Sequence, residues 1–233
     1  MTFATNHIGH FLFTNLIMPK IITAAQLPNR ERGETRIINV TSLSPTRSGI
    51  RWSDMDFSRA NKTLPVDEQP NYEMLRHWGA SIDGLEEGSY VGIEAYNQSK
   101  VANVLYSIGL NKRLYKRYGI LSLAVHPGII RTELSRYADA ATASAIDAIM
   151  KTPGLYIKTL GAGSSTSVVA AVSPRVGVPV TKEGEEGTGR ENLGVYWMDC
   201  EVSDGADWRA VSGANAGRLW GLSEDMVGEK FSW

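Results

Sequence analysis

A tyrosine and a lysine four residues apart are the strongest candidates for chemistry in this sequence. They lie in Tyr96-Asn97-Gln98-Ser99-Lys100, and residues four apart share one face of a helix. A free phenol has a pKa of about 10, so it exchanges protons poorly near neutral pH. An ammonium about 4 Å away stabilises the phenolate by roughly 4 kcal/mol at an effective dielectric of about 20, which is enough to bring that pKa near neutrality. The spacing therefore predicts a tyrosine that acts as acid and base, although such pairs are also common on ordinary exposed helix faces.

The hydroxyl of Ser42 is a third group that the fold must bring to this pair. The run Arg36-Ile37-Ile38-Asn39-Val40-Thr41 is short and β-branched, which is typical of a buried strand in a parallel sheet. Ser42 follows at the carboxyl end of this strand, where open α/β sheets bind their ligands. We therefore expect Ser42 to meet Tyr96 and Lys100 there, with the hydroxyl of Thr41 as an alternative.

A long helix is expected to carry the tyrosine and the lysine. From Ala95 to Tyr118 the apolar residues follow a helical period, and Gly119 stands where a C-terminal cap belongs. Another helix is expected over Phe3–Ile22, with Pro19 near its fraying end. The other predicted elements are strands at Ile120–Val125 and Gly194–Asp199, a helix at about Ser164–Ala171, a helical turn near Tyr72–Trp78 within an irregular stretch from Leu43 to about Glu94, a solvated loop at Lys182–Asn192 and an irregular tail.

The alternation of strands and helices predicts an α/β fold with a parallel sheet, and the chain is expected to form one domain over residues 1–233. Its 24 basic and 25 acidic side chains offer no electrostatic footprint for nucleic acid. The single cysteine, Cys200, excludes an internal disulfide and a Cys-rich zinc site. The most apolar run, Phe11–Ile22, falls short of the roughly 20 residues that span a bilayer. We therefore expect a cytoplasmic protein with no membrane span.

Four blocks of sequence, in order, give the chain a resemblance to the short-chain dehydrogenase/reductase family, in its retinol-dehydrogenase-like and WW-domain-oxidoreductase-like branch. The blocks are Thr5-Asn6-His7-Ile8-Gly9-His10-Phe11, Asn39-Val40-Thr41-Ser42, Tyr96-Asn97-Gln98-Ser99-Lys100-Val101-Ala102-Asn103, and Pro127-Gly128 with Ile130 and Thr132. The resemblance covers residues 3 to about 228. It implies a Rossmann-like, three-layer domain that interconverts an alcohol and its ketone or aldehyde with NADP, or with NAD.

The resemblance also implies a role for each matched residue. Tyr96 would exchange a proton with the substrate oxygen, Ser42 would hydrogen-bond the same oxygen, and Lys100 would lower the tyrosine pKa and hold the nicotinamide ribose. Asn6 would anchor a water that leads protons to solvent. The loop that would bind the nicotinamide end of the cofactor contains Pro127, Gly128, Ile130 and Thr132. A homodimer through the helices at Phe3–Ile22 and Ala95–Tyr118 is a further implication.

The sequence departs from the family pattern in its first third. It lacks the opening strand, the Thr-Gly-x-x-x-Gly-x-Gly turn that receives the pyrophosphate, and the Asn-Asn-Ala-Gly strand. Gly161-Ala162-Gly163 is the nearest similar run, and we interpret it as a loop that leads into a small-residue helix. The family pattern therefore implies a domain without its N-terminal strands, in which Arg36–Thr41 lacks its central neighbour. The alternative function is a catalytically inactive fragment that at most binds a partner.

Two further pairs of residues have a chemical and a structural interpretation. His7 and His10 have a spacing compatible with a metal site, but no third ligand follows, so we interpret them as helix residues. Trp52 and Trp78 are interpreted first as packing residues and second as parts of a substrate lid.

Overall fold

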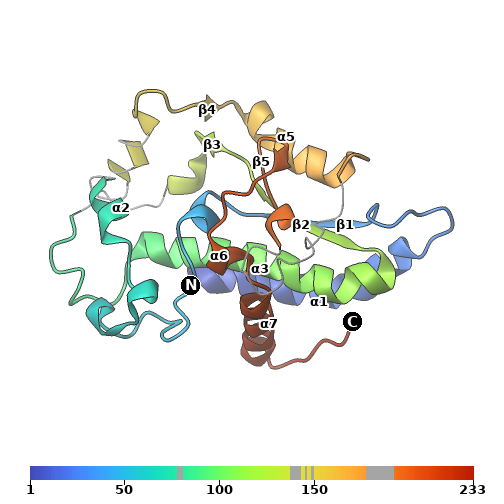
Figure 1. Cartoon of the computed structure of the whole chain (residues 1–233), viewed down its shortest axis with the longest axis horizontal. Helices are drawn as coiled ribbons and strands as arrows, with labels where there is room; N and C mark the ends of the chain where they lie inside the picture. Colours follow the sequence, from blue (N-terminus) through green and yellow to red (C-terminus); the bar gives the residue numbers. More distant parts are fainter. Residues whose placement is uncertain (78–80, 137–142, 145, 148–149, 177–191) are drawn as a thin grey trace.

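The computed structural model describes residues 1–77, 81–136, 143–144, 146–147, 150–176 and 192–233. Its helices and strands, arranged as in Figure 1, are a π-helix at Ala4–Ile8, α1 (Gly9–Ala25), β1 (Arg36–Val40), α2 (Tyr72–His77), α3 (Gly92–Tyr118), β2 (Leu121–His126), β3 (Ile129–Ile130), β4 (Ile157–Lys158), α5 (Leu160–Val172), β5 (Tyr196–Met198), β6 (Glu201–Val202), α6 (Trp208–Val211) and α7 (Gly213–Val227). Short 3-10 turns occupy Ser44–Thr46, Asn61–Thr63, Val66–Glu68, Glu133–Ser135 and Leu193–Val195.

The main sheet has the strand order β1-β2-β5-β6, in which the first three strands are parallel and β6 is antiparallel. Val40 at the end of β1 lies beside Val125 near the end of β2, so the two strands finish together. The three predicted strands and the α/β class are confirmed, with strand ends shifted by one or two residues. A second, two-stranded parallel sheet joins β3 to β4.

Helices cover both faces of the main sheet and make three layers, as in a Rossmann-like fold. α3 packs on β1 and β2, with α1 and α7 against it, whereas α5 packs on β1, β2 and β5 from the other face (Figure 1). Because neighbouring residues of a strand point to opposite faces, Ala124 packs with Leu105 of α3 and Val125 packs with Ala170 of α5. β2 is buried on both faces, which explains its almost wholly apolar sequence.

α3 ends where the sequence predicted. Gly119 has a left-handed φ of 73°, and its N–H donates to the carbonyl of Tyr115. A Cβ at this position would approach the Cα of Arg32 to 3.2 Å. Both the backbone angle and the close approach therefore favour glycine.

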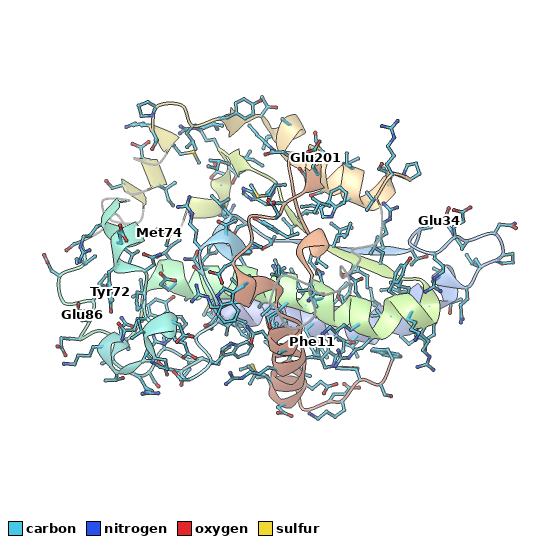
Figure 2. The ribbon with its side chains drawn as sticks, viewed as in Figure 1. Phe11, Glu34, Tyr72, Met74, Glu86 and Glu201 are labelled. Carbon is cyan, nitrogen blue, oxygen red and sulfur yellow. The ribbon has the colours of Figure 1, made fainter. Side chains whose placement is uncertain are left out.

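The prediction that the first helix frays at Pro19 is wrong, because α1 continues to Ala25. A proline inside a helix removes one backbone hydrogen bond. In α1 that loss is offset by packing, since Ile21, Ile22 and Ala25 contact a buried cluster that includes Phe11. Figure 2 labels Phe11 within the helical layer below the sheet.

The prediction of an irregular tail after the third strand is also wrong, because this segment forms α6 and α7. The N-terminus of α7 is capped by Ser212, whose hydroxyl accepts a hydrogen bond from the N–H of Asn215, and Gly228 ends the helix with a left-handed φ of 72°. Leu219 and Trp220 lie buried against α3 and α1. The serine cap and the glycine stop are sequence signals that the prediction overlooked.

The helix Ala4–Ala25, which joins the π-helix and α1, is long enough and apolar enough to cross a membrane by length and composition. The expectation of no membrane span was based on the shorter apolar run Phe11–Ile22. The longer helix Ala4–Ala25 removes the argument from length. Length and composition are weak indications, because a helix of a protein core passes the same test. Phe11 and Met18 face the core and are fully buried, whereas Phe13 and Leu16 are exposed.

Among the described residues, β1 pairs only with β2, so its other edge is unpaired, as expected of the Arg36–Thr41 strand. The helical turn predicted near Tyr72–Trp78 is confirmed as α2, although Trp78 itself lies outside the described residues. The predicted loop Lys182–Asn192 also lies outside them except for its last residue.

The cap of α3 predicts opposite effects for two glycine substitutions. Gly119→Ala should lower the free energy of unfolding by about 1–2 kcal/mol, because alanine is strained at a positive φ. Gly217→Ala, in the interior of α7 where a Cβ meets nothing within 4 Å, should raise it by roughly 0.5–1 kcal/mol. Urea unfolding followed by circular dichroism measures both, and equal effects of the two substitutions would contradict the cap assignment.

Candidate active site

A cavity of about 910 Å³ opens at the carboxyl ends of β1 and β2. Its lining includes all eight residues that the sequence analysis singled out as catalytic or cofactor-binding: Asn6, Ser42, Tyr96, Lys100, Pro127, Gly128, Ile130 and Thr132. The two strands end side by side, and α3 passes beneath them, so residues separated by up to 126 positions meet in one space.

Tyr96 and Lys100 lie one turn apart on α3, as their spacing predicted. The ammonium of Lys100 is 5.7 Å from the centre of the Tyr96 ring. Burial raises the pKa of Tyr96 above its ordinary value, and the side chain of Ser42 acts in the opposite direction. Burial lowers the pKa of Lys100. Burial therefore disfavours the charged form of each group: it moves the pKa of the phenol away from neutral pH and the pKa of the ammonium toward it, so a lowered tyrosine pKa requires the nearby positive charge of Lys100.

Lys100 is also part of a junction that joins the end of β1 to α3. Its ammonium donates to the carbonyl of Val40 at 3.2 Å, and the side-chain amide of Asn103 donates to the same oxygen at 3.0 Å. In return, the hydroxyl of Thr41 donates to the backbone carbonyl of Lys100 at 2.7 Å. The hydroxyl of Thr41 is thus engaged in this junction and 3% exposed, which favours Ser42 over Thr41 as the substrate-facing hydroxyl.

Ser42 stands just beyond that junction. Its carbonyl accepts a hydrogen bond from the hydroxyl of Tyr196 on β5 at 2.9 Å. Its own hydroxyl donates to the hydroxyl of Ser44 at 2.8 Å and accepts from the N–H of Ser44 at 3.1 Å. Both the backbone and the side chain of Ser42 are therefore held in place by neighbouring residues.

Asn6 reaches the site from the π-helix, a rare form that is frequent at functional sites. Its side-chain amide donates to the hydroxyl of Ser99 at 3.0 Å, and that hydroxyl donates to the carbonyl of Tyr96 at 2.7 Å. Asn6 thus lies against the turn of α3 that carries the tyrosine.

The loop after β2 forms another wall of the cavity. Gly128 has a φ of 88°, and a Cβ there would lie 2.6 Å from the side chain of Lys158, so only glycine fits. Ile130 belongs to β3, which pairs with β4. A Cβ on Gly163 would come within 2.1 Å of Ile130. Gly161-Ala162-Gly163 lies in the first turn of α5 and packs on this loop, so its interpretation as a loop that leads into a small-residue helix is wrong: the helix already begins at Leu160.

The sequence analysis missed the apolar part of the lining. It comes mainly from the segment between β1 and α3, through Leu43, Met74, Leu75, Leu85 and Val91, and from Ile93 in the first turn of α3. Figure 2 labels Tyr72 and Met74 on α2, and Met74 is one of the residues that line the cavity. Apolar residues without a period in an irregular segment gave no signal of this role.

His126 is a second residue whose place was not foreseen. It is 7% exposed, lines the cavity at the end of β2, and its Nδ1 has no hydrogen-bond partner within the described structure. Burial, with a smaller contribution from Lys158, lowers its pKa to about 4, so the imidazole is neutral at physiological pH.

The structural interpretation of the histidine pair and of Trp52 agrees with their surroundings. His7 is fully buried, its Nε2 lies 2.7 Å from the hydroxyl of Ser223, and its ring packs on Phe3 and Tyr106. Burial lowers its pKa to about 3. The part of the chain that the structure describes holds no cluster of three metal-ligating residues. Trp52 packs on the core beneath the guanidinium of Arg218 and does not line the cavity.

Curated proteins with similar sequences include short-chain dehydrogenases, retinol dehydrogenases and an uncharacterized oxidoreductase. The chloroplastic short-chain dehydrogenase TIC 32 A of Brassica napus is 28% identical over 97% of this chain and 56% of its own length. Retinol dehydrogenase 11 of Mus musculus is 28% identical over 100% of this chain and 56% of its own, and an uncharacterized oxidoreductase of Schizosaccharomyces pombe is 34% identical over 74% and 42%. No protein-family model matches the chain. The chain spans about half the length of these curated relatives.

The contact of Lys100 with the Tyr96 ring predicts a change in the tyrosine titration. Lys100→Met should raise the pKa of Tyr96 further, because the neighbouring positive charge that favours the phenolate is gone. The pKa is measured from the absorbance of tyrosinate as a function of pH, with Tyr96→Phe as the reference that isolates the signal. Lys112→Met, farther along α3, is the control and should leave the titration unchanged. A pKa that is unaffected in both variants would show that Lys100 does not act on the phenol.

Proposed function

The chain belongs to the short-chain dehydrogenase/reductase family of enzymes, on its retinol-dehydrogenase-like side, and from this premise we propose that it interconverts an alcohol and its ketone or aldehyde with NAD(P). The observation that carries the proposal is that Ser42, Tyr96 and Lys100 line one cavity at the strand ends. This convergence requires that the end of β1, which carries Ser42, lie against the helix that carries both Tyr96 and Lys100.

In the proposed reaction, Tyr96 gives a proton to the carbonyl oxygen in reduction and takes one from the alcohol in oxidation. Ser42 hydrogen-bonds the same oxygen and fixes it beside the phenol. The ammonium of Lys100 stabilises the phenolate that remains after proton transfer, which offsets the effect of burial on the tyrosine pKa. Asn6, next to the turn that carries Tyr96, would hold a water through which the lysine exchanges protons with solvent.

The residues of the cavity fit the nicotinamide end of a dinucleotide. The backbone of Gly128 lines the cavity, and Thr132 offers a hydroxyl to the same space. Lys100 would hold the ribose hydroxyls, while Pro127 and Ile130 would line the face of the ring. When bound, the nicotinamide would supply or accept the hydride. We propose NADP as the cofactor, on branch resemblance, with NAD as the alternative.

The apolar part of the lining supports a bulky apolar substrate. Met74, Leu75 and Leu85 face the same space as Tyr96. Burying such a substrate contributes about 25 cal/mol for each Å² of apolar surface removed from water. A small, strongly hydrated alcohol would gain little from this wall.

We also propose a cytoplasmic homodimer. The exposed apolar residues Phe13, Leu16 and Ile17 on α1 support an interface between copies at this helix. Leu16→Glu should convert the dimer to a monomer, because a charge is costly to bury at the centre of an apolar contact. Light scattering after size-exclusion chromatography measures the mass, and Leu27→Glu, at an exposed site beyond the end of α1, is the control. A monomeric parent chain would contradict this proposal.

Tyr96→Phe tests the proposed reaction most directly. The substitution removes the proton donor and keeps the ring, so turnover should fall by about 10²-fold or more. The assay follows NADPH absorbance with apolar aldehydes and ketones of increasing size. Since the ring is retained, NADPH should bind the variant as it binds the parent chain, and this is measured by cofactor fluorescence.

Two results would contradict the proposed function. Turnover of Tyr96→Phe close to that of the parent chain would show that another group transfers the proton. Absence of NADPH and NADH binding to the parent chain would favour the alternative of a catalytically inactive, binding protein.

A further inference from the structure

A line of buried and half-buried hydrogen bonds runs along the cavity wall from Ser42 through Ser44 and Asn97 to Glu94. We propose that three residues in this line, Ser44, Asn97 and Glu94, are positioning residues that fix the direction of the Ser42 hydroxyl. The proposal rests on the role given to Ser42 and Tyr96 in the proposed function, and we call the set Ser42, Ser44, Asn97 and Glu94 the serine relay.

The contacts of the serine relay are continuous. The hydroxyl of Ser42 lies 2.8 Å from that of Ser44, which donates to Oδ1 of Asn97 at 2.7 Å. Nδ2 of Asn97 then donates to Oε2 of Glu94 at 3.3 Å. Ser44 is 9% exposed and Asn97 is 3% exposed, so water does not compete freely for these groups. Glu94 and Asn97 lie in the first two turns of α3, just before and just after Tyr96.

Glu94 sets the direction of every bond in the relay. A carboxylate can only accept hydrogen bonds, so the NH₂ of the Asn97 amide must face it. The other oxygen of Glu94 accepts from the backbone N–H of Asn71 at 3.3 Å, which holds the carboxylate in place. With its NH₂ committed to Glu94, Asn97 presents its carbonyl oxygen to Ser44.

The same logic fixes the two hydroxyls. A carbonyl oxygen cannot donate, so the single proton of Ser44 points to Asn97. Ser44 can then only accept from Ser42, and the proton of Ser42 points to Ser44 rather than into the cavity. The N–H of Ser44 also donates to the hydroxyl oxygen of Ser42 at 3.1 Å. Ser42 therefore presents an acceptor to the cavity.

The direction of the Ser42 proton determines whether the site binds the alcohol or the carbonyl compound more tightly. An alcohol can donate its proton to Ser42, whereas a ketone has only acceptors and must draw the proton of Ser42 away from Ser44. The relay therefore favours the alcohol over the carbonyl compound in binding. The side chain of Ser42 already lowers the pKa of Tyr96, and because its proton points to Ser44 it does so less than a hydroxyl that is free to donate to the phenolate.

The experiment frees the Ser42 proton and follows two readouts. Ser44→Ala removes the acceptor, so Ser42 can donate into the cavity. The pKa of Tyr96, read from tyrosinate absorbance with Tyr96→Phe as reference, should fall. Benzylacetone, an apolar ketone, should bind about five-fold more tightly relative to the alcohol formed by its reduction, which is the effect of one ordinary hydrogen bond. Binding is measured by calorimetry without cofactor.

Matched variants separate positioning from simple packing. Ser48→Ala makes the same change at another buried serine of the same segment that has no side-chain partner in the relay, and it should alter neither readout. Ser44→Thr keeps the hydroxyl and should restore both. Glu94→Gln keeps the shape of the side chain but can donate a hydrogen bond, so the Asn97 amide is no longer fixed. Both readouts should change in the same direction as in Ser44→Ala, by a smaller amount. This variant provides the test if Ser44→Ala does not fold.

The outcomes distinguish this proposal from the proposed function. The tyrosine titration needs neither substrate nor cofactor, so it tests the relay even if the chain lacks dehydrogenase activity. If Ser44→Ala and Glu94→Gln match Ser48→Ala in the titration and in the ratio of ketone to alcohol affinity, the relay does not set the direction of Ser42. Loss of activity in Tyr96→Phe with no response to Ser44→Ala would overturn the relay alone.

Discussion

The candidate site depends on the junction between the last residue of β1 and the middle of α3. The carbonyl of Val40 has no strand neighbour on its outer side within the described structure, and it accepts hydrogen bonds from Lys100 and Asn103. These two contacts give this backbone oxygen side-chain partners in place of a strand neighbour, and they fix the position of Lys100 relative to the sheet. Since Tyr96 is one turn from Lys100 and Ser42 is two residues beyond Val40, this junction sets the position of all three groups. The lysine is thus a structural residue of the sheet edge as well as a candidate for chemistry.

A buried arginine organises the irregular segment that forms the apolar wall. Arg51 is 5% exposed, forms an ion pair with Asp54 and donates to the side chain of Asn61 at 2.6 Å and to the carbonyl of Arg59 at 2.7 Å. Burial alone would raise the pKa of Asp54, but hydrogen bonds from Arg59, Arg51 and Ser58 hold it below its usual range. A segment with no helical or strand period is therefore ordered by charge-assisted hydrogen bonds around one guanidinium. This ordering lets α2 place Met74 and Leu75 over the cavity.

The elements that carry the site were predictable because their signals are local. The β-branched run before Ser42, the period of α3 and the glycine after Tyr118 each lie within a few neighbouring residues, and each was found. The pair Tyr96 and Lys100 was predictable for the same reason. The apolar wall, the place of His126 and the serine relay were not, since they depend on contacts between residues far apart, such as Ser44 with Asn97. The tail helices α6 and α7 had local signals in Ser212 and Gly228. The prediction of an irregular tail was therefore wrong although the sequence contains the capping residues that indicate a helix.

Four titratable groups whose charged forms burial disfavours lie together at one end of the sheet. Burial disfavours the charged forms of Tyr96, Lys100, Glu94 and His126, each of which lies at or next to the carboxyl ends of β1 and β2. A core built only for stability would place apolar groups there, as it does along the length of β2, because desolvating a charge costs free energy. The strand ends instead hold polar groups whose charged forms burial disfavours. Burying such groups is unfavourable for stability, and titratable groups with shifted pKa values are frequent at functional sites, so the position of these residues is better explained by chemistry than by folding.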